Sequence, residues 1–553
     1  MNILIKRCIG CQKDFNLDQN DLGFYEKLES PIPNYCPSCR MQRRLAHRNE
    51  RTLYKRKCDL CKEDKISLYP AETPWPVYCA SCWWGDGWDA KDFAQEYNSN
   101  KPFFEQFKEL QFRVPCSALN VTTSVNSEYT NNAGDNKNCY LIFAAENNED
   151  CYYGRLVHGC KFVADVVSIY DSELCYECID CHKCYNCLFN ERCQTSIDLL
   201  FCLNMRDSQN CIFSVNGRHK SYLIENEPCS KEEFETKKKE ILSSSQNIEK
   251  AKKQFEELKS QSFVKYAFQT KCVRATGDYL FNCHDTKIAY DVRNAKNCAY
   301  LFDAEDPIDT YDGNNIYYKP ELCLDMMGIL QCYRCKFSAY IFYSSETEYS
   351  IHSYNISNCF GCIGMKKGEY CILNKQYSKD NYEKIKNQII ESMKKEGVYG
   401  DFIPPSLSSF GYNETLAKEY FPMTKEEAKS AGFIWQNKET GTFSKETISI
   451  NAMPNTIEEV SDNILNEILV CVDCSRNFRI TKDEFNFYKR MHLPLPRKDF
   501  ECRHKDRMNK RNPRKLWHRK CMKENCSNEF ETSYAPDRPE IVYCEECYQK
   551  EVY

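Results

Sequence analysis

Cysteine pairs separated by two residues are the clearest chemical signal in the sequence. Four such pairs lie near the N-terminus: Cys8/Cys11, Cys36/Cys39, Cys58/Cys61 and Cys79/Cys82. Zinc prefers four thiolate or imidazole ligands in a tetrahedron, and each pair supplies two thiolates from one tight turn. The four pairs therefore predict two zinc sites. Sequential pairing is the simplest arrangement, while a cross-braced one, which joins the first pair to the third, stays open.

The C-terminus carries a second set of these cysteines. An offset of 463 residues, which rises to 465 after a two-residue insertion, brings the N-terminal pattern onto Cys471, Cys474, Cys502, Cys521, Cys526, Cys544 and Cys547. We therefore interpret residues 471–553 as a copy of residues 1–83. One ligand is replaced, because Cys36 falls on Asp499. Zinc also accepts oxygen and imidazole, so Asp499 or the nearby His504 could complete this site. A weakened or empty third site is the alternative to a full set of about four zinc ions.

Each terminal module holds a basic segment between its second and third cysteine pairs. The arginines at helical spacing could contact phosphates, which dominate nucleic-acid affinity. Tyr54 and Trp517 occupy equivalent positions and could stack on a base. The alternative is a solvated basic helix, or one that docks onto the acidic middle of the same chain. The candidate nucleic-acid contacts are Arg40, Arg43, Arg44, Arg48, Arg51, Arg56, Arg503, Arg507, Arg511, Arg514 and Arg519.

The middle of the chain repeats with a short period. Cys175, Cys184, Cys193, Cys202 and Cys211 recur every ninth residue. Such a period predicts stacked β-coils, and the β-branched, aromatic, Asn and Asp content argues against helices. We expect a mainly β fold with two tandem parallel β-solenoid blocks of nonapeptide type. Helices would cap the blocks, and zinc-ribbon or treble-clef-like modules would flank them.

The expected domains follow from these patterns. Ser230 and Glu233 form a capping box that opens a helix or helical hairpin, and residues 378–396 form its shorter counterpart. The segments are 1–83, the N-terminal zinc module; 84–119, a connector; 120–229, the first solenoid; 230–264, the helix or hairpin; 265–377, the second solenoid; 378–396, a capping helix; 397–470, a junction; and 471–553, the C-terminal zinc module.

The cysteines of the middle allow two interpretations. Cys175, Cys178, Cys181, Cys184 and Cys187 recur every third residue, as in a metal cluster. A free cysteine is also a small hydrophobic residue that fits a narrow coil interior. We favour core packing over extra metal or redox chemistry. The Asp column at 180, 198 and 207 is interpreted as a turn ladder, although carbohydrate-active β-solenoids place acids in this way.

The sequence resembles a known but uncharacterised group of proteins. The motifs are Cys-x-x-Cys followed by Tyr35-Cys36-Pro37-Ser38-Cys39-Arg40, and Phe421-Pro422-Met423-Thr424. They resemble an uncharacterised family of cysteine-rich, zinc-ribbon-flanked bacterial proteins, and the resemblance covers nearly the whole chain. It implies no activity. It implies a full CxxC where this chain has Asp499 to Cys502, which puts the third zinc site in doubt.

Composition and missing motifs limit the function classes. The 553 residues include 37 cysteines and have a net charge of −5, with basic ends and an acidic middle. We find no signal-peptide core, long apolar run, P-loop, dinucleotide fingerprint or catalytic pair. We therefore expect a cytoplasmic, non-enzymatic zinc protein without membrane contact that binds nucleic acid, RNA more than DNA. A protein–protein scaffold and a β-solenoid carbohydrate-active enzyme are the alternatives, and no catalytic residue or oligomeric state is predicted.

Overall fold

The computed structural model describes residues 3–438 and 441–553. The chain forms mainly strands in parallel sheets and divides into two compact units. Unit 1 comprises Met1–Leu119, Ala267–Asn437 and Arg514–Leu516, and unit 2 comprises Asn120–Tyr266, Lys438–Pro513 and Trp517–Tyr553. Each unit thus combines one terminal module with the stack of strands more distant from it in the sequence. The predicted junction includes residues 439–440, which lie outside the described residues.

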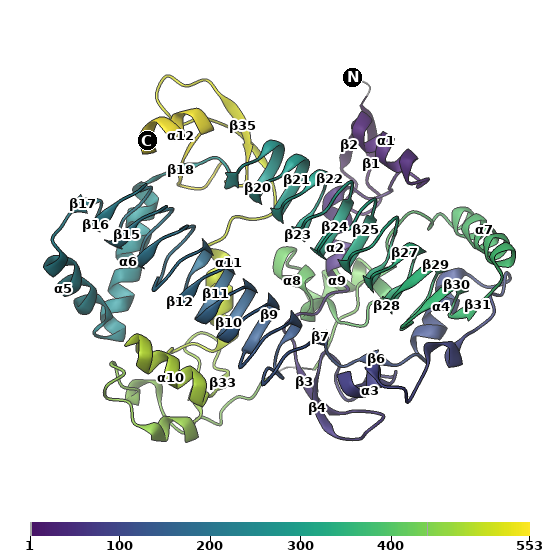
Figure 1. Cartoon of the computed structure of the whole chain (residues 1–553), viewed down its shortest axis with the longest axis horizontal. Helices are drawn as coiled ribbons and strands as arrows, with labels where there is room; N and C mark the ends of the chain where they lie inside the picture. The colour runs from purple at the N-terminus through teal and green to yellow at the C-terminus, as the bar shows by residue number, and fades with distance from the viewer. Residues whose placement is uncertain (1–2, 439–440) are drawn as a thin grey trace. The chain divides into compact units, whose positions relative to one another are not determined.

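Unit 2 contains the first parallel ladder, whose strands lie side by side in a stack (Figure 1). Its core consists of inward cysteines and aliphatic side chains. The strands are β7 (Val121–Thr122), β8 (Asn131–Gly134), β9 (Tyr140–Glu146), β10 (Glu149–His158), β11 (Lys161–Tyr170), β12 (Glu173–Tyr176), β13 (Ile179–His182), β14 (Ile197–Leu200), β15 (Gln209–Ile212) and β16 (Ser221–Ile224), with the antiparallel β17 (Glu227–Pro228) at its end.

Unit 1 contains the second parallel ladder, which is built in the same way. Its strands are β19 (Gln269–Thr270), β20 (Val273–Phe281), β21 (His284–Arg293), β22 (Lys296–Ala299), β23 (Phe302–Glu305), β24 (Tyr311–Tyr317), β25 (Leu324–Leu330), β26 (Ala339–Phe342), β27 (Ser345–Glu348), β28 (Ile351–Tyr354), β29 (Ile356–Phe360) and β30 (Gly368–Ile372), with the antiparallel β31 (Lys375–Gln376) at its end.

The register of the ladders differs from the predicted period. Cys151 pairs with Val163, and Val163 pairs with Cys175, so each step advances by 12 residues. Every third residue, such as Asp171, Leu174 and Glu177, has a left-handed backbone conformation. The structural unit is therefore a triplet with one inward side chain. Nine and 12 are both multiples of three, so cysteines nine apart share the inward position without lying in one column. The predicted nonapeptide period is wrong for this reason.

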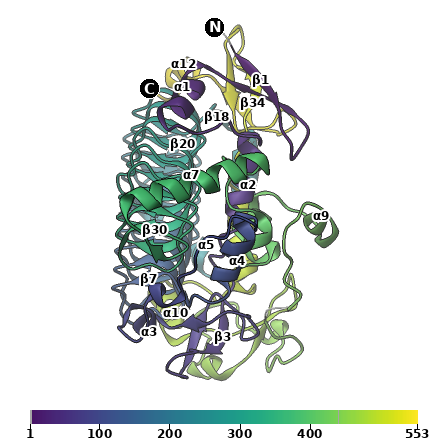
Figure 2. The same cartoon turned by 90° about the vertical axis from the view of Figure 1, so that its right-hand side faces the viewer.

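Helices follow both ladders, as the capping signals predict. Ser230 caps α5 (Lys231–Leu242) through the predicted box with Glu233, and α6 (Ser245–Gln261) completes a hairpin. In unit 1, α7 (Lys379–Lys395) packs on β30, where Tyr382 lies 5.7 Å from Tyr370 between ring centroids (Figure 2). Of these helices, α5 contacts β15 and β16, and α7 contacts β30, so they pack on the last strands of the two ladders. Further helices of unit 1 are α4 (Phe103–Gln111), α8 (Leu416–Tyr420) and α9 (Lys425–Ser430).

The terminal modules have the same order of elements. In unit 1 these are β1 (Leu4–Arg7), β2 (Asp14–Leu17), α1 (Gln19–Lys27), α2 (Pro37–Leu45), β3 (Tyr54–Lys57), β4 (Asp64–Ser67), β5 (Val77–Tyr78) and α3 (Ala80–Trp84). In unit 2 they are β32 (Leu469–Val470), β33 (Asn477–Phe478), α10 (Lys482–Met491), α11 (Phe500–Asn509), β34 (Trp517–Lys520), β35 (Glu529–Thr532), β36 (Ile541–Tyr543) and α12 (Glu545–Val552). The remaining short strands are β6 (Cys116–Ser117), paired with β5, and β18 (Phe263–Lys265), paired with β36.

Within residues 3–438 and 441–553, no helix combines the length and the apolar character that a membrane span requires.

Candidate metal centres

Four clusters of side chains could each hold a metal ion. In each cluster the four potential ligand atoms lie within 4.8 Å of one another. The structure groups the cysteine pairs sequentially, and the cross-braced arrangement does not occur in these clusters. We number them in chain order: centre 1 is Cys8/Cys11/Cys36/Cys39, centre 2 is Cys58/Cys61/Cys79/Cys82, centre 3 is Cys471/Cys474/Asp499/Cys502, and centre 4 is Cys521/Cys526/Cys544/Cys547.

Each centre is built from a hairpin turn and the start of a helix. In centre 1, Cys8 and Cys11 lie in the turn between β1 and β2, and Cys36 is the N-cap of α2. The backbone N–H of Cys36 donates to the Sγ of Cys8 at 3.2 Å. Centres 2 and 4 repeat this bond, from Cys79 to Cys58 at 3.2 Å and from Cys544 to Cys521 at 3.3 Å. These bonds hold the first thiol of each turn against the start of the helix.

The spacing of the sulfur atoms fits a tetrahedral ion. With zinc–sulfur bonds of about 2.3 Å, the edge of the tetrahedron is about 3.8 Å. The Sγ atoms of Cys11 and Cys36 lie 3.7 Å apart, and those of Cys61 and Cys79 lie 3.9 Å apart. In centre 4, Cys526 and Cys544 are also separated by 3.9 Å. A disulfide requires about 2.05 Å, and every cysteine of the described chain is a free thiol.

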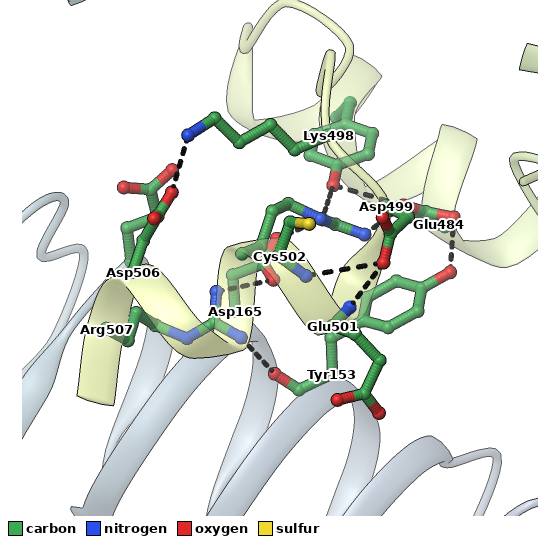
Figure 3. A network of polar contacts seen from close by, with 12 residues as sticks. Tyr153, Asp165, Glu484, Lys498, Asp499, Glu501, Cys502, Asp506 and Arg507 are labelled. Atoms are coloured by element: carbon green, nitrogen blue, oxygen red, sulfur yellow. Dashed lines mark hydrogen bonds and ion pairs between the residues drawn. The ribbon is translucent and has the colours of Figure 1, made fainter. Parts of the chain in front are cut away.

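Centre 3 uses Asp499 where the other centres have a fourth thiol. The Oδ2 atom of Asp499 accepts a hydrogen bond from the Sγ of Cys474 at 2.9 Å. Asp499 itself lies at the start of α11, close to Cys502 (Figure 3). Burial raises the pKa of Asp499, but hydrogen bonds from the thiols of Cys474, Cys471 and Cys502 outweigh it, so the pKa is lowered. The carboxylate is therefore charged and directed at the three thiols. His504, the other candidate ligand, is buried and lies outside the cluster.

The cysteines of the ladders serve a different role. None of them joins a group of potential metal ligands in the part of the chain that is described. The Sγ of Cys175 donates to the carbonyl oxygen of Glu173 at 3.4 Å. It also lies 3.7 Å from the carbonyl oxygen of Cys184, nine residues later in the sequence. Cys178 and Cys181 repeat this pattern. Burial raises the pKa of the Cys193 thiol to about 12, so this thiol stays protonated and packs as a core residue.

The predicted nucleic-acid contacts of the N-terminal module point mainly into the protein. Arg40 pairs with Asp312 of the second ladder at 2.9 Å, and Arg44 pairs with Asp325 at 2.5 Å. Both arginines are buried. Burial raises the pKa of Asp325 to about 6 against the opposing effect of Arg44. The helix that starts at centre 1 is thus held on the second ladder by buried ion pairs.

The other candidate cations of this module also have partners. Arg43 lies over the ring of Tyr35, with 4.2 Å from its guanidinium carbon to the centroid. The remaining pairs are Arg48 with Glu50 at 2.7 Å, Arg51 with Glu419 at 2.6 Å and Arg56 with Asp59 at 2.7 Å. Tyr54, the predicted stacking residue, is buried and donates to Glu414 at 2.5 Å.

The C-terminal module docks in the same manner on the first ladder. Arg503 and Arg507 of α11 both pair with the fully buried Asp165 of β11 (Figure 3), the latter at 2.8 Å. Arg511 pairs with Asp180 at 2.8 Å. Within unit 1, Arg514 pairs with Asp291, and within unit 2, Arg519 donates to the carbonyl oxygen of Ala535 at 3.1 Å. These contacts agree with the alternative stated for the basic segments, in which their helix docks onto the acidic middle of the same chain.

Replacing Arg48 by Ala should destabilise unit 1. Arg48 and Glu50 are both buried and lie 2.7 Å apart. Removing one partner of a buried ion pair costs about 3–5 kcal/mol, because the other charge loses its compensation. The urea midpoint of unit 1 should fall accordingly. Lys57→Ala is the matched control, since Lys57 and Asp64 are exposed, and its midpoint should stay near that of the wild type. Equal midpoints for the two variants would contradict the structural role of Arg48.

Sequence reasoning missed the acids that receive these arginines. Asp165, Asp312 and Asp325 lie on strands whose other residues are mainly buried. A signal was present for two of them, because Asp165 and Asp325 each interrupt a mainly apolar segment, such as Lys-Phe-Val-Ala-Asp-Val-Val in residues 161–167. A buried carboxylate requires a partner. The pairing arginines lie hundreds of positions away, so the sequence does not identify them.

Comparisons with known proteins add little to this description. No family model matches the chain, and no curated protein matches it. Among solved structures, it is similar to a protein from Desulfovibrio desulfuricans G20 described as a "putative acetyltransferase". The two are 9% identical, the match covers 50% of this chain and 81% of that one, and the TM-score is 0.11. A likeness this low carries no argument about fold or function.

Proposed function

We propose that the protein is a non-enzymatic zinc protein that acts as a scaffold for other proteins. Four zinc ions would fold the hairpin and helix starts of the two terminal modules. The observation that carries this proposal is that each module sends buried arginines onto buried aspartates of a parallel ladder. The cations expected to bind phosphate are thus used for internal assembly, which favours a structural role for the modules.

We interpret each ladder as a β-solenoid whose coils contain 12 residues, and the two modules as products of one duplication. The near-constant register supports the first interpretation. The shared order of elements supports the second. A regular stack of this kind presents flat, rigid faces on which a partner can dock.

Exposed apolar side chains on the first ladder supply a candidate partner surface. Tyr185 and Ile197 are 47% and 50% exposed and pair with each other in the register. Adjacent exposed apolar groups favour contact with another protein. We expect Tyr185→Ser combined with Ile197→Ser to leave folding and zinc content unchanged and to weaken any quantified partner complex at least about tenfold. If the double change leaves the affinity of the complex unaltered while Lys57→Ala weakens it, the partner does not bind at Tyr185 and Ile197.

Nucleic-acid binding, RNA more than DNA, is the second candidate function. It is favoured by the exposed cations on the hairpin of centre 2, namely Lys55, Lys57 and Lys62. Phosphate contacts of this kind weaken as salt rises. If this candidate is right, the zinc-loaded protein shifts single-stranded RNA at low salt and the triple change to Ala abolishes the shift. Absence of any shift at low salt leaves the scaffold as the proposal.

A carbohydrate-active enzyme finds less support. Of the acids that suggested it, Asp180 is paired with Arg511 and Asp198 is paired with Lys238. A glycosidase needs two carboxyl groups that face the substrate at a separation of about 5–10 Å. These two acids are instead used in contacts within unit 2.

A further inference from the structure

Centre 3 differs from the other centres in how its helix begins. The helices that start at centres 1, 2 and 4 have Cys36, Cys79 and Cys544 as N-caps, and none of these side chains makes a capping hydrogen bond. In α11, the N-cap Asp499 accepts hydrogen bonds through Oδ1 from the backbone N–H groups of Glu501 and Cys502, at 2.8 and 3.3 Å. Side-chain caps of this kind stabilise a helix start. The start of α11 is therefore stabilised without an ion.

The second oxygen of Asp499 faces the ligand cluster. Oδ1 caps the helix (Figure 3), while Oδ2 lies 2.9 Å from the Sγ of Cys474. One carboxylate thus hydrogen-bonds within the cluster and can offer a single oxygen to a metal ion. Zinc bound here would have three thiolates and one carboxylate. Because soft thiolates account for much of the affinity for zinc, this set binds more weakly than four thiolates.

Contacts that need no metal ion hold the rest of α11. Arg503 and Arg507 bind Asp165 of β11, and Arg503 also donates to the hydroxyl of Tyr488 at 3.0 Å. Just before the helix, Lys498 pairs with Asp506 at 2.8 Å (Figure 3) and with Asp473 at 2.7 Å. These contacts anchor the helix start and the following turns to unit 2. Loss of an ion from centre 3 therefore leaves the helix its cap and its docking contacts.

We propose that centre 3 is an exchangeable zinc site, which releases and rebinds its ion while α11 stays folded on the first ladder. The three all-cysteine centres, in contrast, lose zinc only together with local unfolding, since structural zinc supplies the folding energy of such modules. Centre 3 thus exchanges its ion with the zinc ions available in solution, while the rest of the protein keeps its fold. This inference rests on the zinc-protein function proposed above.

The test is graded chelation of the zinc-loaded, full-length protein. A chromogenic chelator reports zinc release, and hydrogen exchange measured in parallel reports the protection of Phe500–Asn509. We expect one ion per chain to leave at least about tenfold faster than the other three. The backbone amides of α11 should stay protected after this first ion has left, and added zinc should refill the site.

Three variants identify the centre that releases its zinc ion fastest. Asp499→Cys restores four thiolates, so the fast phase should disappear while four ions remain. Asp499→Asn keeps a capping oxygen but removes the charge, so release should become faster still with α11 protected. Asp483→Asn changes an exposed acid on α10 of the same module, outside the cluster and its anchoring contacts, and should release zinc at the rate of the wild type. A fast phase that survives in Asp499→Cys would overturn the assignment.

The possible failures are distinguishable. Four ions that leave as a single kinetic class, or an α11 that loses protection together with the first ion, would overturn the exchangeable site and leave the zinc protein intact. A purified chain that binds no zinc at any centre would instead overturn the proposed function itself.

Discussion

Replacing Asp165 by Asn is expected to destabilise unit 2 by about 3–5 kcal/mol or more. The carboxylate of Asp165 is fully buried and receives both Arg503 and Arg507. The change keeps the size of the side chain and removes its charge. Two guanidinium groups then remain in a site that is shielded from water. Both have lost the charge of Asp165, and Arg503 keeps only Glu484 at 3.5 Å. Breaking a buried ion pair from one side is costly for this reason.

The effect should be local to the docking of α11. In the zinc-loaded protein, hydrogen exchange of Phe500–Asn509 should accelerate, and the thermal midpoint of unit 2 should fall. Asp171→Asn is the matched control. Asp171 directly follows β11, the strand that contains Asp165, and its side chain is 56% exposed. That variant should behave as the wild type. A change of less than about 1 kcal/mol for Asp165→Asn, a value typical of exposed pairs, would contradict the docking role of this carboxylate.

Replacing Cys58 and Cys61 by Ser is expected to remove one zinc ion and unfold the second half of the N-terminal module. These residues supply two of the four ligands of centre 2. Structural zinc contributes about 10–16 kcal/mol to the folding of small zinc modules, which β3, β4 and α3 cannot recover from their short hairpin and single-turn helix. Limited proteolysis should then cut within residues 53–82, and the zinc content should fall from four to three.

The control for this double change is Cys229→Ser combined with Cys272→Ser. Both cysteines are partly exposed thiols outside the four centres. The same chemical replacement there should leave zinc content and proteolysis unchanged. Unchanged zinc content after the loss of Cys58 and Cys61 would show that the centre 2 assignment is wrong.

The metal centres could be predicted because their information is local. Each cysteine pair forms one tight turn, and two pairs separated by a few tens of residues suffice to define a centre. The missing fourth thiol of centre 3 was visible as Asp499, and the choice between Asp499 and His504 required the structure. His504 lies on α11 among buried side chains, so its spacing from Cys502 alone could not decide.

The sequence predicted the parallel, stacked strands of the ladders, but not the number of residues between paired positions on neighbouring strands. Parallel stacked strands follow from the inward cysteines and the β-rich composition. The step of 12 residues could not be read from cysteines nine apart, because an inward side chain occurs at every third residue of each coil. The register became clear only from the pairing of residues such as Cys151, Val163 and Cys175.

The role of the arginines could not be predicted, because it depends on contacts between distant segments. Arg40 and Arg503 are basic residues on helices beside cysteine pairs, a pattern that also occurs in nucleic-acid-binding modules. Their partners Asp312 and Asp165 lie on the ladder that is more distant in sequence in each case. No local pattern encodes this arrangement, in which each terminal module joins the farther ladder.

The zinc content of the intact protein shows whether the four clusters are metal centres. Protein purified in zinc-containing buffer without chelators, then freed of unbound metal, should contain four zinc ions per chain by elemental analysis, with all 37 thiols reduced. Six or more ions would show that ladder thiols bind metal and are not simply core residues. A chain with no zinc and with disulfides among the cysteines of the four centres would show that these clusters are not zinc sites.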